Sequence, residues 1–473
     1  MSNDLTTKPN EDLPNLPQAR VDRRDFIGGA AAAAGIAAGL VSMPFVVTRA
    51  RAESSGSVRF GSLNDLSGNF AKADMPKHHA IQLAIKEIND GFTLANGPTG
   101  PGGLGTKEGY EEVDDILVPS NDKGINGQPI ELIAYDGQSD NRVYQQLTRR
   151  LILEDKVDVL MAAAASAERE SIRPIIDQTK QLYFYNNQYE GGVADKYTFC
   201  TGAVPEQQII PVMQYCVGKF GKRIYILAAD YNFGQLSAMW TRAFAPALDA
   251  EVIGQEFIPL SVSDFTSTIS RIQKAKPDWL MMYITGQNHT NYYPQSNAAN
   301  ARYPMGSSIN LAQGYEHKVF APPALAGMHV AVSYMEEIPT KRNQAFVKRW
   351  HTMFPNEPYI QQEAHSSYVG AHIYAIAARL AKTTDQPAVL EALESGIGLE
   401  TPAGWMFMDP ATHHMSQYIR TAQCDEHHTI TFVQEWPHLE PWWTRRLGVN
   451  LVRTPEFKQY TPEDDPYFKK NLK

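Results

Sequence analysis

Apolar and polar positions along this chain follow the rhythm of strands alternating with helices. Period-two or continuous β-type runs predict strands at 58–63, 130–135, 157–163, 182–185, 224–229, 251–260, 279–285 and 327–335. Apolar residues recurring every three or four positions predict helices at 76–90, 141–154, 167–179, 206–220, 234–248, 265–272, 343–354, 363–382 and 386–395. This alternation predicts an α/β fold of parallel sheets flanked by helices on both faces.

Two successive α/β units of similar size predict two lobes with a ligand cleft between them. The first lobe is expected to hold 53–203 and 328–396, with an irregular Gly- and Pro-rich insertion at 92–128. The second lobe is expected to hold 204–327 and 397–436, and the tail at 437–473 has no period and is expected to wrap the surface. In open parallel sheets, ligands bind at the carboxyl ends of the strands.

The N-terminus has the features of a twin-arginine signal peptide. Arg23 and Arg24 precede an apolar run at 27–47 and a small-x-small site that ends at Ala52. Residues 1–52 are therefore predicted to direct export to the periplasm and to be removed, which leaves Glu53 first. A permanent membrane anchor is the alternative, since the run is close to the ~20 residues that a spanning helix needs. Its Gly and Ala content favours export with cleavage.

Composition narrows the functional classes. The formal net charge of −9 argues against a nucleic-acid partner. The three cysteines form no Cys-x-x-Cys pair, and the paired histidines lack the spacing of a metal cage, so we predict neither a metal site nor a cofactor. Cys200 and Cys216 can form a disulfide or remain buried thiols, and the sequence leaves both open.

Four short strings carry the functional signal. They read Tyr-Asn-Asn-Gln-Tyr-Glu-Gly at 185–191, Thr-Gly-Ala-Val-Pro-Glu-Gln-Gln at 201–208, Asp-Tyr-Asn-Phe-Gly at 230–234 and Pro-Leu-Ser-Val-Ser-Asp-Phe-Thr at 259–266. In this order and spacing they resemble the urea and short-chain-amide branch of the type I periplasmic binding proteins, the branched-chain amino-acid-type family that serves ABC importers. The resemblance implies a two-lobed binding protein, not an enzyme, that closes on a small solute and docks on an inner-membrane ABC permease.

The chain also departs from the family's usual outline. The insertion at 92–128 and the long tail do not belong to that outline. Four alanines at 162–165 stand before Ser166, where a Gly- and Thr-containing loop is often found.

A small neutral amide needs hydrogen-bond donors on one side and acceptors on the other. Ser166 lies just before the helix predicted at 167–179, whose first N–H groups are free to bind an oxygen, although Ser166 also suits a helix N-cap. Glu190 is the sharpest candidate to accept from a ligand NH2 group, and its alternative role is a solvated loop carboxylate. The candidate ligand-binding residues are Ser67, Ser166, Tyr185, Asn187, Tyr189, Glu190, Tyr231, Tyr283, Gly286, Gln287 and Glu316.

Two other functional classes remain open from the residues. An amino acid is an alternative ligand, with its ammonium group paired to Glu190 or Glu316. An exported amidase or oxidoreductase is less favoured, because the chain has no Gly-x-Ser-x-Gly, His-Glu-x-x-His or strand-linked Gly-x-Gly-x-x-Gly motif.

Overall fold

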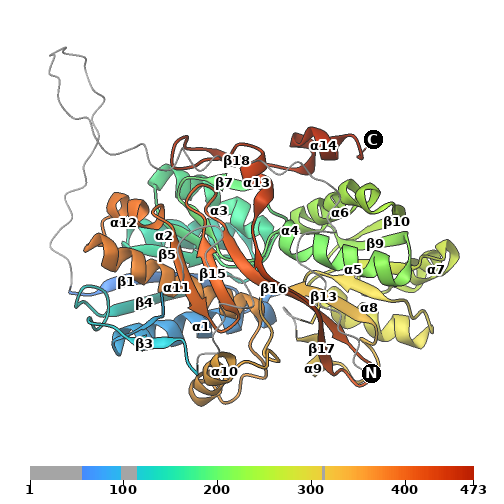
Figure 1. The fold of residues 1–473 in the computed structure, drawn as a ribbon, viewed down its shortest axis with the longest axis horizontal. Coiled ribbons are helices and arrows are strands. Elements are labelled where there is room, and N and C mark those ends of the chain that lie inside the picture. Colours follow the sequence, from blue (N-terminus) through green and yellow to red (C-terminus); the bar gives the residue numbers. More distant parts are fainter. Residues whose placement is uncertain (1–55, 97–113, 312–314, 473) are drawn as a thin grey trace, which may run out of the picture. The chain divides into compact units, whose positions relative to one another are not determined.

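The structure, a computed structural model, describes residues 56–96, 114–311 and 315–472 (Figure 1). The predicted signal peptide and much of the predicted insertion lie outside these residues. Contacts divide the chain into Met1–Ser57 and Val58–Lys473, and the fold described below is that of the second unit. Within the described ranges, no helix has both the length and the apolar character needed to span a membrane.

Five parallel strands form the first sheet, in the order β4-β1-β5-β6-β8. Their bounds are Val58–Asn64 for β1, Ile130–Asp136 for β4, Val159–Ala162 for β5, Tyr183–Tyr185 for β6 and Thr198–Cys200 for β8. Successive side chains point to opposite faces, so Met161 and Phe184 join one core while Tyr183 and Tyr185 join the other. Both faces are therefore buried, as the sequence pattern predicted.

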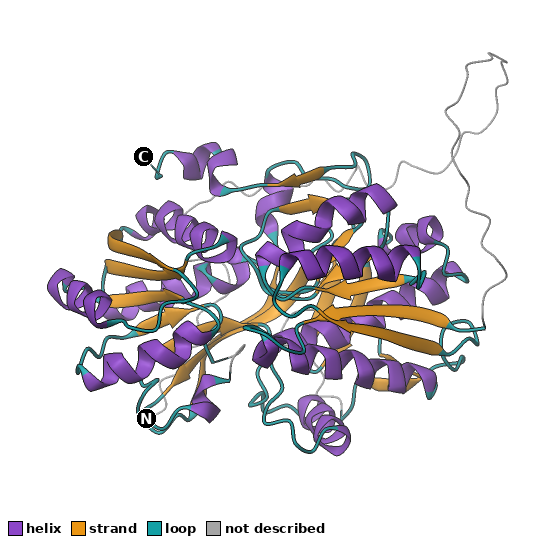
Figure 2. Cartoon of the chain, turned by 180° about the vertical axis from the view of Figure 1, so that it is seen from behind, coloured by secondary structure: helices purple, strands orange, loops and turns teal. Residues whose placement is uncertain are grey.

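Helices cover both faces of this sheet (Figure 2). One core includes α1 (Ala71–Asn89), α10 (Lys341–Met353), α11 (Gln362–Ala381) and α12 (Gln386–Leu393), and the other includes α2 (Asn141–Leu153) and α3 (Ser166–Thr179). Helix α1 begins five residues before the predicted start, so Pro76 lies inside it. Because proline has no N–H, the Lys72 carbonyl lacks its usual helical donor, and the Gln361 side chain donates to it at 3.0 Å instead.

The second sheet has nine strands. Its order is β10-β9-β11-β12-β13-β16-β15-β14, with β17 paired to β16. The parallel part contains β9 (Arg223–Ala229), β10 (Glu251–Ile258), β11 (Trp279–Tyr283), β12 (Met305–Ser307) and β13 (Met328–Val332), and the antiparallel part contains β14 (Ile397–Thr401), β15 (Gly404–Met408), β16 (Met415–Cys424) and β17 (Ile430–Leu439).

The helices of the second lobe follow the predicted rhythm with one break. They are α4 (Pro205–Gln208), α5 (Ile210–Phe220), α6 (Asn232–Phe244) with a 3-10 turn at Ala245–Leu248, α7 (Thr266–Ala275), α8 (Gln287–Ala298) and α9 (Glu316–Val319). The helix predicted at 206–220 is divided at Ile209, two residues before Pro211, whose ring cannot continue the hydrogen-bond ladder.

Two predicted lobe boundaries differ from the structure. Strand β13, at the start of the segment predicted to return to the first lobe, pairs instead with β12 and β16 in the second sheet. The β14–β15 hairpin, predicted for the second lobe, packs its Leu399, Met406 and Met408 side chains into the first core. The reason is β16, which carries Met415 in the first core and Ala422 in the second and so joins the lobes. The remaining division into lobes stays a prediction.

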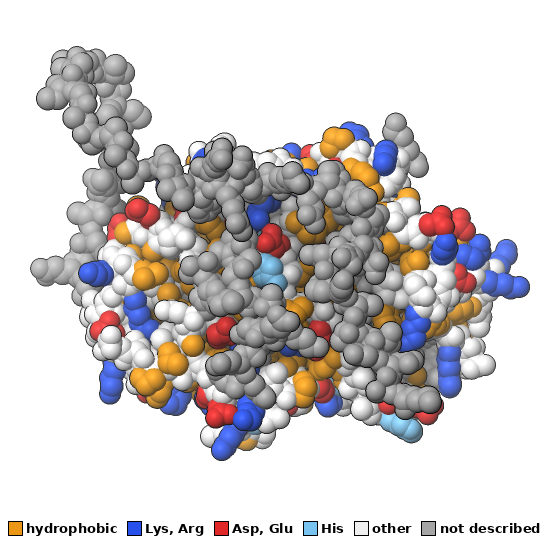
Figure 3. Space-filling view, in the orientation of Figure 1, with side chains coloured by type: hydrophobic (Ala, Val, Ile, Leu, Met, Phe, Trp, Pro, Cys, Tyr) orange, Lys and Arg blue, Asp and Glu red, His pale blue; other side chains and the backbone are white. Residues whose placement is uncertain are grey.

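The predicted insertion and the tail contain short elements. Strands β2 (Phe92–Leu94) and β3 (Leu117–Pro119) pair at the base of the insertion. The tail holds α13 (Trp442–Arg446), β18 (Phe457–Gln459), a 3-10 turn at Pro462–Asp464 and α14 (Pro466–Lys469), and β18 pairs with β7 (Val193–Asp195). In the view of Figure 3, acidic and basic side chains are interspersed over the described part of the surface.

Candidate functional site

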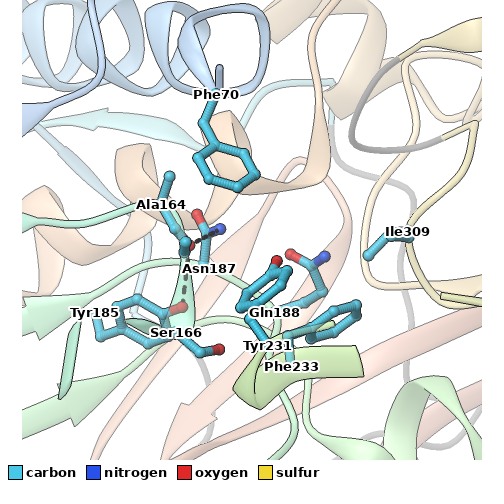
Figure 4. A pocket seen from close by; sticks show the side chains of 10 residues that line it. Phe70, Ala164, Ser166, Tyr185, Asn187, Gln188, Tyr231, Phe233 and Ile309 are labelled. Atoms are coloured by element: carbon cyan, nitrogen blue, oxygen red, sulfur yellow. Dashed lines mark hydrogen bonds between the residues drawn. The ribbon is translucent and has the colours of Figure 1, made fainter. Parts of the chain in front are cut away.

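One cavity collects residues from the carboxyl ends of strands in both lobes. Figure 4 shows their side chains around a shared space. The lining residues are Phe70, Ala164, Ala165, Ser166, Tyr185, Asn187, Gln188, Tyr231, Phe233 and Ile309. Four of the sequence candidates, Ser166, Tyr185, Asn187 and Tyr231, are therefore brought together.

The loop between β5 and α3 forms one wall and is held at nearly every backbone group. The carbonyl of Ala164 accepts from Tyr185 Oη at 3.1 Å and from Asn187 Nδ2 at 2.6 Å. The N–H groups of Ala164 and Ala165 both donate to Glu168 Oε2 at 2.8 Å. Burial, followed by the charges of Asp65 and Asp74, raises the pKa of Glu168 well above its ordinary value.

The start of α3 leaves donors free. Glu168 accepts from the two residues before the helix, while the N–H groups of Ser166 and Ala167 have no acceptor within the part of the chain that the structure describes. Such first-turn N–H groups bind acceptor oxygens and are favoured by the positive end of the helix dipole. A carbonyl oxygen placed here would have two donors.

The opposite requirement, a set of acceptors, is met by Asn187 and Gln188. Asn187 uses its Nδ2 on Ala164, but its buried Oδ1 has no hydrogen-bond partner. Gln188 is 4% exposed, and its Oε1 has no hydrogen-bond partner among the described residues. A buried amide oxygen without a partner costs about 1–3 kcal/mol, and at the cavity these two oxygens are free to accept from a bound molecule.

Glycines in two of the strings allow this geometry. A Cβ on Gly202 would lie 2.0 Å from the Asn187 carbonyl oxygen, so only glycine lets the second string pack behind Asn187. A Cβ on Gly234 would lie 2.0 Å from the Ala229 carbonyl oxygen, which fixes the turn that carries Tyr231. The fourth string contributes no lining residue, because Val262 O and Ser263 O are bonded to side chains of α8.

Aromatic rings close the cavity from both lobes. Phe70 of the first lobe lies with its ring centroid 6.4 Å from that of Tyr231 in the second, and Tyr231 lies 6.2 Å from Phe233. Tyr283 stands behind this wall, edge-on to Phe233 at 6.2 Å, with its hydroxyl bonded to Thr241. Tyr283 therefore supports the cavity without lining it.

The cavity is small and uncharged. About 20 Å³ is open to the centre of a water-sized sphere, against the ~10–15 Å³ that one water needs. None of its described lining residues is Asp, Glu, Lys, Arg or His. The arrangement suits a small neutral molecule with both a carbonyl oxygen and N–H groups.

Glu190, the sharpest sequence candidate, does not line this cavity. Its carboxylate is buried and accepts from Ser166 Oγ at 2.5 Å and from Arg169 Nη2 at 2.6 Å. Burial alone would raise the pKa of Glu190, but the Arg169 charge and the Ser166 hydroxyl lower it below its ordinary value. Glu190 therefore acts on the site through Ser166, because a carboxylate this fully used has little left for a ligand.

Tyr189 and Ser67 are bonded elsewhere. The Tyr189 hydroxyl lies 2.5 Å from His414 Nε2 in the core of the first lobe. Ser67 is exposed and donates to Asp136 at 2.6 Å.

The last three candidates lie at the lobe boundary or behind the cavity. Gly286, with φ +57°, faces Asn69 across the boundary, and Gln287 is exposed. Glu316 is buried, accepts from the Leu311 N–H and lies 2.9 Å from His289 Nδ1, and Lys72 of the first lobe approaches it to 4.0 Å. Burial would raise the pKa of Glu316, but His289 and Lys72 lower it to about 2.

Several lining residues were not among the sequence candidates: Phe70, Ala164, Ala165, Gln188, Phe233 and Ile309. Phe70 had a signal, since it is an aromatic residue in a polar loop. Gln188 lies between two candidates, Asn187 and Tyr189. We find no sequence signal for Ile309.

The described residues contain neither a cluster that could hold a metal ion nor a disulfide. No group of three or more His, Cys, Asp or Glu side chains among them is placed to hold a metal ion. Cys200, Cys216 and Cys424 are buried free thiols, so the disulfide that the sequence left open between the first two is not formed. Burial raises the pKa of the Cys200 thiol to about 12.

Comparison with known proteins gives a family and a fold. A sequence model of the family described as periplasmic binding protein matches residues 57–429. Among similar solved structures, a solute-binding protein of an ABC transporter from Rhodopseudomonas palustris, in complex with 3,4-dihydroxybenzoic acid, has 18% sequence identity and a TM-score of 0.66 over 81% of this chain and 98% of that one.

Two further structures have the same fold. An ABC transporter substrate-binding protein from Sphaerobacter thermophilus has 19% identity and a TM-score of 0.66, covering 81% of this chain and 99% of its own. A branched-chain amino acid transporter substrate-binding protein from Streptococcus pneumoniae, in complex with isoleucine, has 15% identity and a TM-score of 0.64, covering 80% and 99%. At these identities the likeness shows the two-lobed type I fold.

Proposed function

We propose that this chain, which belongs to the periplasmic binding protein family, captures urea or a short-chain amide between its lobes and delivers it to an ABC permease of the inner membrane. The observation that carries the proposal is the uncharged cavity in which Gln188 Oε1 and Asn187 Oδ1 are buried without partners. These groups are costly unless a ligand bonds to them.

The donors and acceptors match one ligand orientation. The ligand carbonyl oxygen accepts from the free N–H groups of Ser166 and Ala167 at the start of α3. Its NH2 groups donate to Asn187 Oδ1 and Gln188 Oε1. The rings of Phe70 and Tyr231, one from each lobe, suit a planar molecule and require that the lobes close to complete the site.

The same features weigh against the other ligand classes. An amino acid brings an ammonium group that needs a carboxylate, but Glu190 is bonded to Ser166 and Arg169 and Glu316 lies beside His289. An aromatic acid, the ligand named for one similar structure, brings a carboxylate, and no Lys, Arg or His side chain among the described residues lines the cavity to pair with it. A buried polar pocket rejects isosteres that leave its groups unpaired.

Location is part of the proposal. The Arg23-Arg24 pair, the apolar run at 27–47 and the site ending at Ala52 support export by the twin-arginine route, with the mature protein acting in the periplasm.

Thermal shift of the mature protein, residues 53–473, tests the ligand class. The panel contains urea, formamide, acetamide, guanidine, amino acids and hydroxybenzoates. A ligand at a hundred times its dissociation constant is expected to stabilise the protein by ~2.7 kcal/mol. Gln188→Met keeps the side-chain volume but removes the amide, so the affinity for urea or amide should fall by about 10- to 100-fold.

Gln146→Met is the matched control, because this glutamine is exposed on α2 and does not line the cavity. It should leave affinity unchanged. Stabilisation by amino acids or aromatic acids alone, or by no compound in the panel, would contradict the proposal.

A further inference from the structure

The C-terminal segment, residues 440–472, begins after the last residue of the family match at 429 and contacts both lobes. In Figure 1 it runs along one edge of the molecule from β7 to α6. On the first lobe, β18 pairs with β7, and Val449 and Leu451 pack on Ala194.

The same segment is anchored to α6 of the second lobe by aromatic contacts. Trp443 and Phe468 stand edge-on to Trp240, with ring centroids at 4.6 and 5.2 Å. Asn471 Nδ2 donates to the Ala243 carbonyl at 2.8 Å. The segment therefore ties the two lobes together with buried groups at each end.

Between these anchors, Gln459 reaches the residue that holds Ser166. Its Nε2 donates to Glu190 Oε1 at 3.0 Å and to the Gly191 carbonyl at 3.2 Å. The Glu190 backbone carbonyl in turn accepts from Trp240 Nε1 at 3.0 Å. Glu190 thus joins α3, the second lobe and the C-terminal segment at one buried point.

The hydrogen bond from Ser166 to Glu190 determines which hydrogen bonds the Ser166 hydroxyl can make with a ligand. A hydroxyl has one proton to donate and two lone pairs that accept. Glu190 is held as a carboxylate by Arg169, so it can only accept, and the Ser166 proton is directed to it at 2.5 Å. One lone pair of the Ser166 oxygen accepts from Arg169 Nη1 at 3.5 Å. The other can accept from a ligand N–H, but the hydroxyl has no proton to offer a ligand oxygen.

We propose that Gln459 is a positioning residue for ligand selectivity: by holding Glu190, it keeps Ser166 an acceptor and favours ligands that carry N–H groups. The proposal rests on the proposed function of the cavity. It makes the C-terminal segment part of the recognition machinery, although no residue of that segment lines the cavity.

Acetamide and acetate provide the test, because they have nearly the same shape but differ in N–H groups and charge. Gln459→Met removes the donor and keeps the volume, and Lys458→Met is the control, since Lys458 is the neighbour on β18 whose side chain is half exposed and bonded to Asp464. Titration calorimetry should show the ratio of acetamide to acetate affinity falling about tenfold in Gln459→Met and unchanged in Lys458→Met. An equal loss for both ligands, or no loss, would overturn the proposal.

A second measurement needs no ligand. Hydrogen exchange of peptides covering 164–170 and 188–193 should be faster in Gln459→Met than in the wild type and unchanged in Lys458→Met. If the wild type binds no amide, the proposed function fails but this exchange still tests the link from Gln459 to Ser166. Equal exchange in the three proteins would show that the link has no effect.

Discussion

Two buried glutamates of the first lobe are held in opposite charge states by their surroundings. Glu190 has the Arg169 guanidinium and the Ser166 hydroxyl beside it, which together outweigh burial and lower its pKa. Glu363, near the start of α11, is 1% exposed. Burial raises the pKa of Glu363 to about 8, because a backbone hydrogen bond and the charge of Lys77 offset only part of the cost of desolvation. The same side chain is thus an anion in one place and an acid in the other at neutral pH.

Glu363→Gln is expected to stabilise the protein at pH 7 to 8. The pKa of Glu363 is raised on folding, so its unfavourable contribution is absent below the unfolded pKa near 4.5 and grows as the pH rises toward about 8. The variant should gain roughly 1–3 kcal/mol at pH 8 and little at pH 4. Calorimetric melting across this range measures the difference.

Glu391→Gln, at an exposed position of α12, is the control and should melt like the wild type at each pH. If Glu363→Gln shows the same dependence on pH as the wild type, Glu363 is ionised in the folded protein and the argument fails.

At the level of single residues, the sequence predicted positions that depend on local order along the chain. Ser166 and Asn187 follow buried strands, and their place at the cavity edge follows from that. The role of Glu190 could not be predicted in the same way, because its partner Gln459 is 269 residues away. Phe70 and Ile309 reach the cavity only because two lobes face each other.

The helices and strands show the same division between local and distant causes. The alternation of strands and helices is predictable because the spacing of apolar residues within each segment depends on that segment alone. Most elements form where expected. Which sheet a strand joins is decided by pairing over long distances. For this reason the sequence pattern predicts β13 in the first lobe and the β14–β15 hairpin in the second, whereas β13 pairs in the second sheet and the hairpin packs into the first core.

Helix α13 provides a prediction at the level of an element. Trp443 is fully buried and stands edge-on to Trp240. Its backbone N–H donates to Glu206 Oε1 at 2.9 Å. Trp443→Ala should cost about 3–5 kcal/mol of stability, because it leaves a large cavity between the segment and α6. Calorimetry is the suitable measurement, since urea is itself a candidate ligand.

Trp442→Ala is the matched control on the same helix. Trp442 is only half-buried, so its removal should cost about 1 kcal/mol or less. Equal losses of stability in the two variants would mean that the contact between Trp443 and Trp240 adds no stability of its own.

For the whole molecule, the first question is where it works. The twin-arginine interpretation rests on Arg23 and Arg24, which lie outside the described residues. Replacing both by Lys should leave the precursor, with its leader, in the cytoplasmic fraction, because the route reads the arginine pair. Immunoblots of fractionated cells measure this.

Arg20→Lys is the control for export, since Arg20 precedes the pair and is not part of it. It should not affect export. Normal export of the double variant would exclude the twin-arginine route and leave the ligand proposal standing.

The contact between Glu190 and Gln459 also sets an order of events during synthesis. A chain leaving the ribosome carries Glu190 long before Gln459, and the loop between them spans 269 residues. The contact that holds Glu190 therefore forms only after Gln459 has been made. An export route that accepts folded chains lets the contact between Glu190 and Gln459 form in the cytoplasm. A chain that crosses the membrane unfolded would have to form this contact after export.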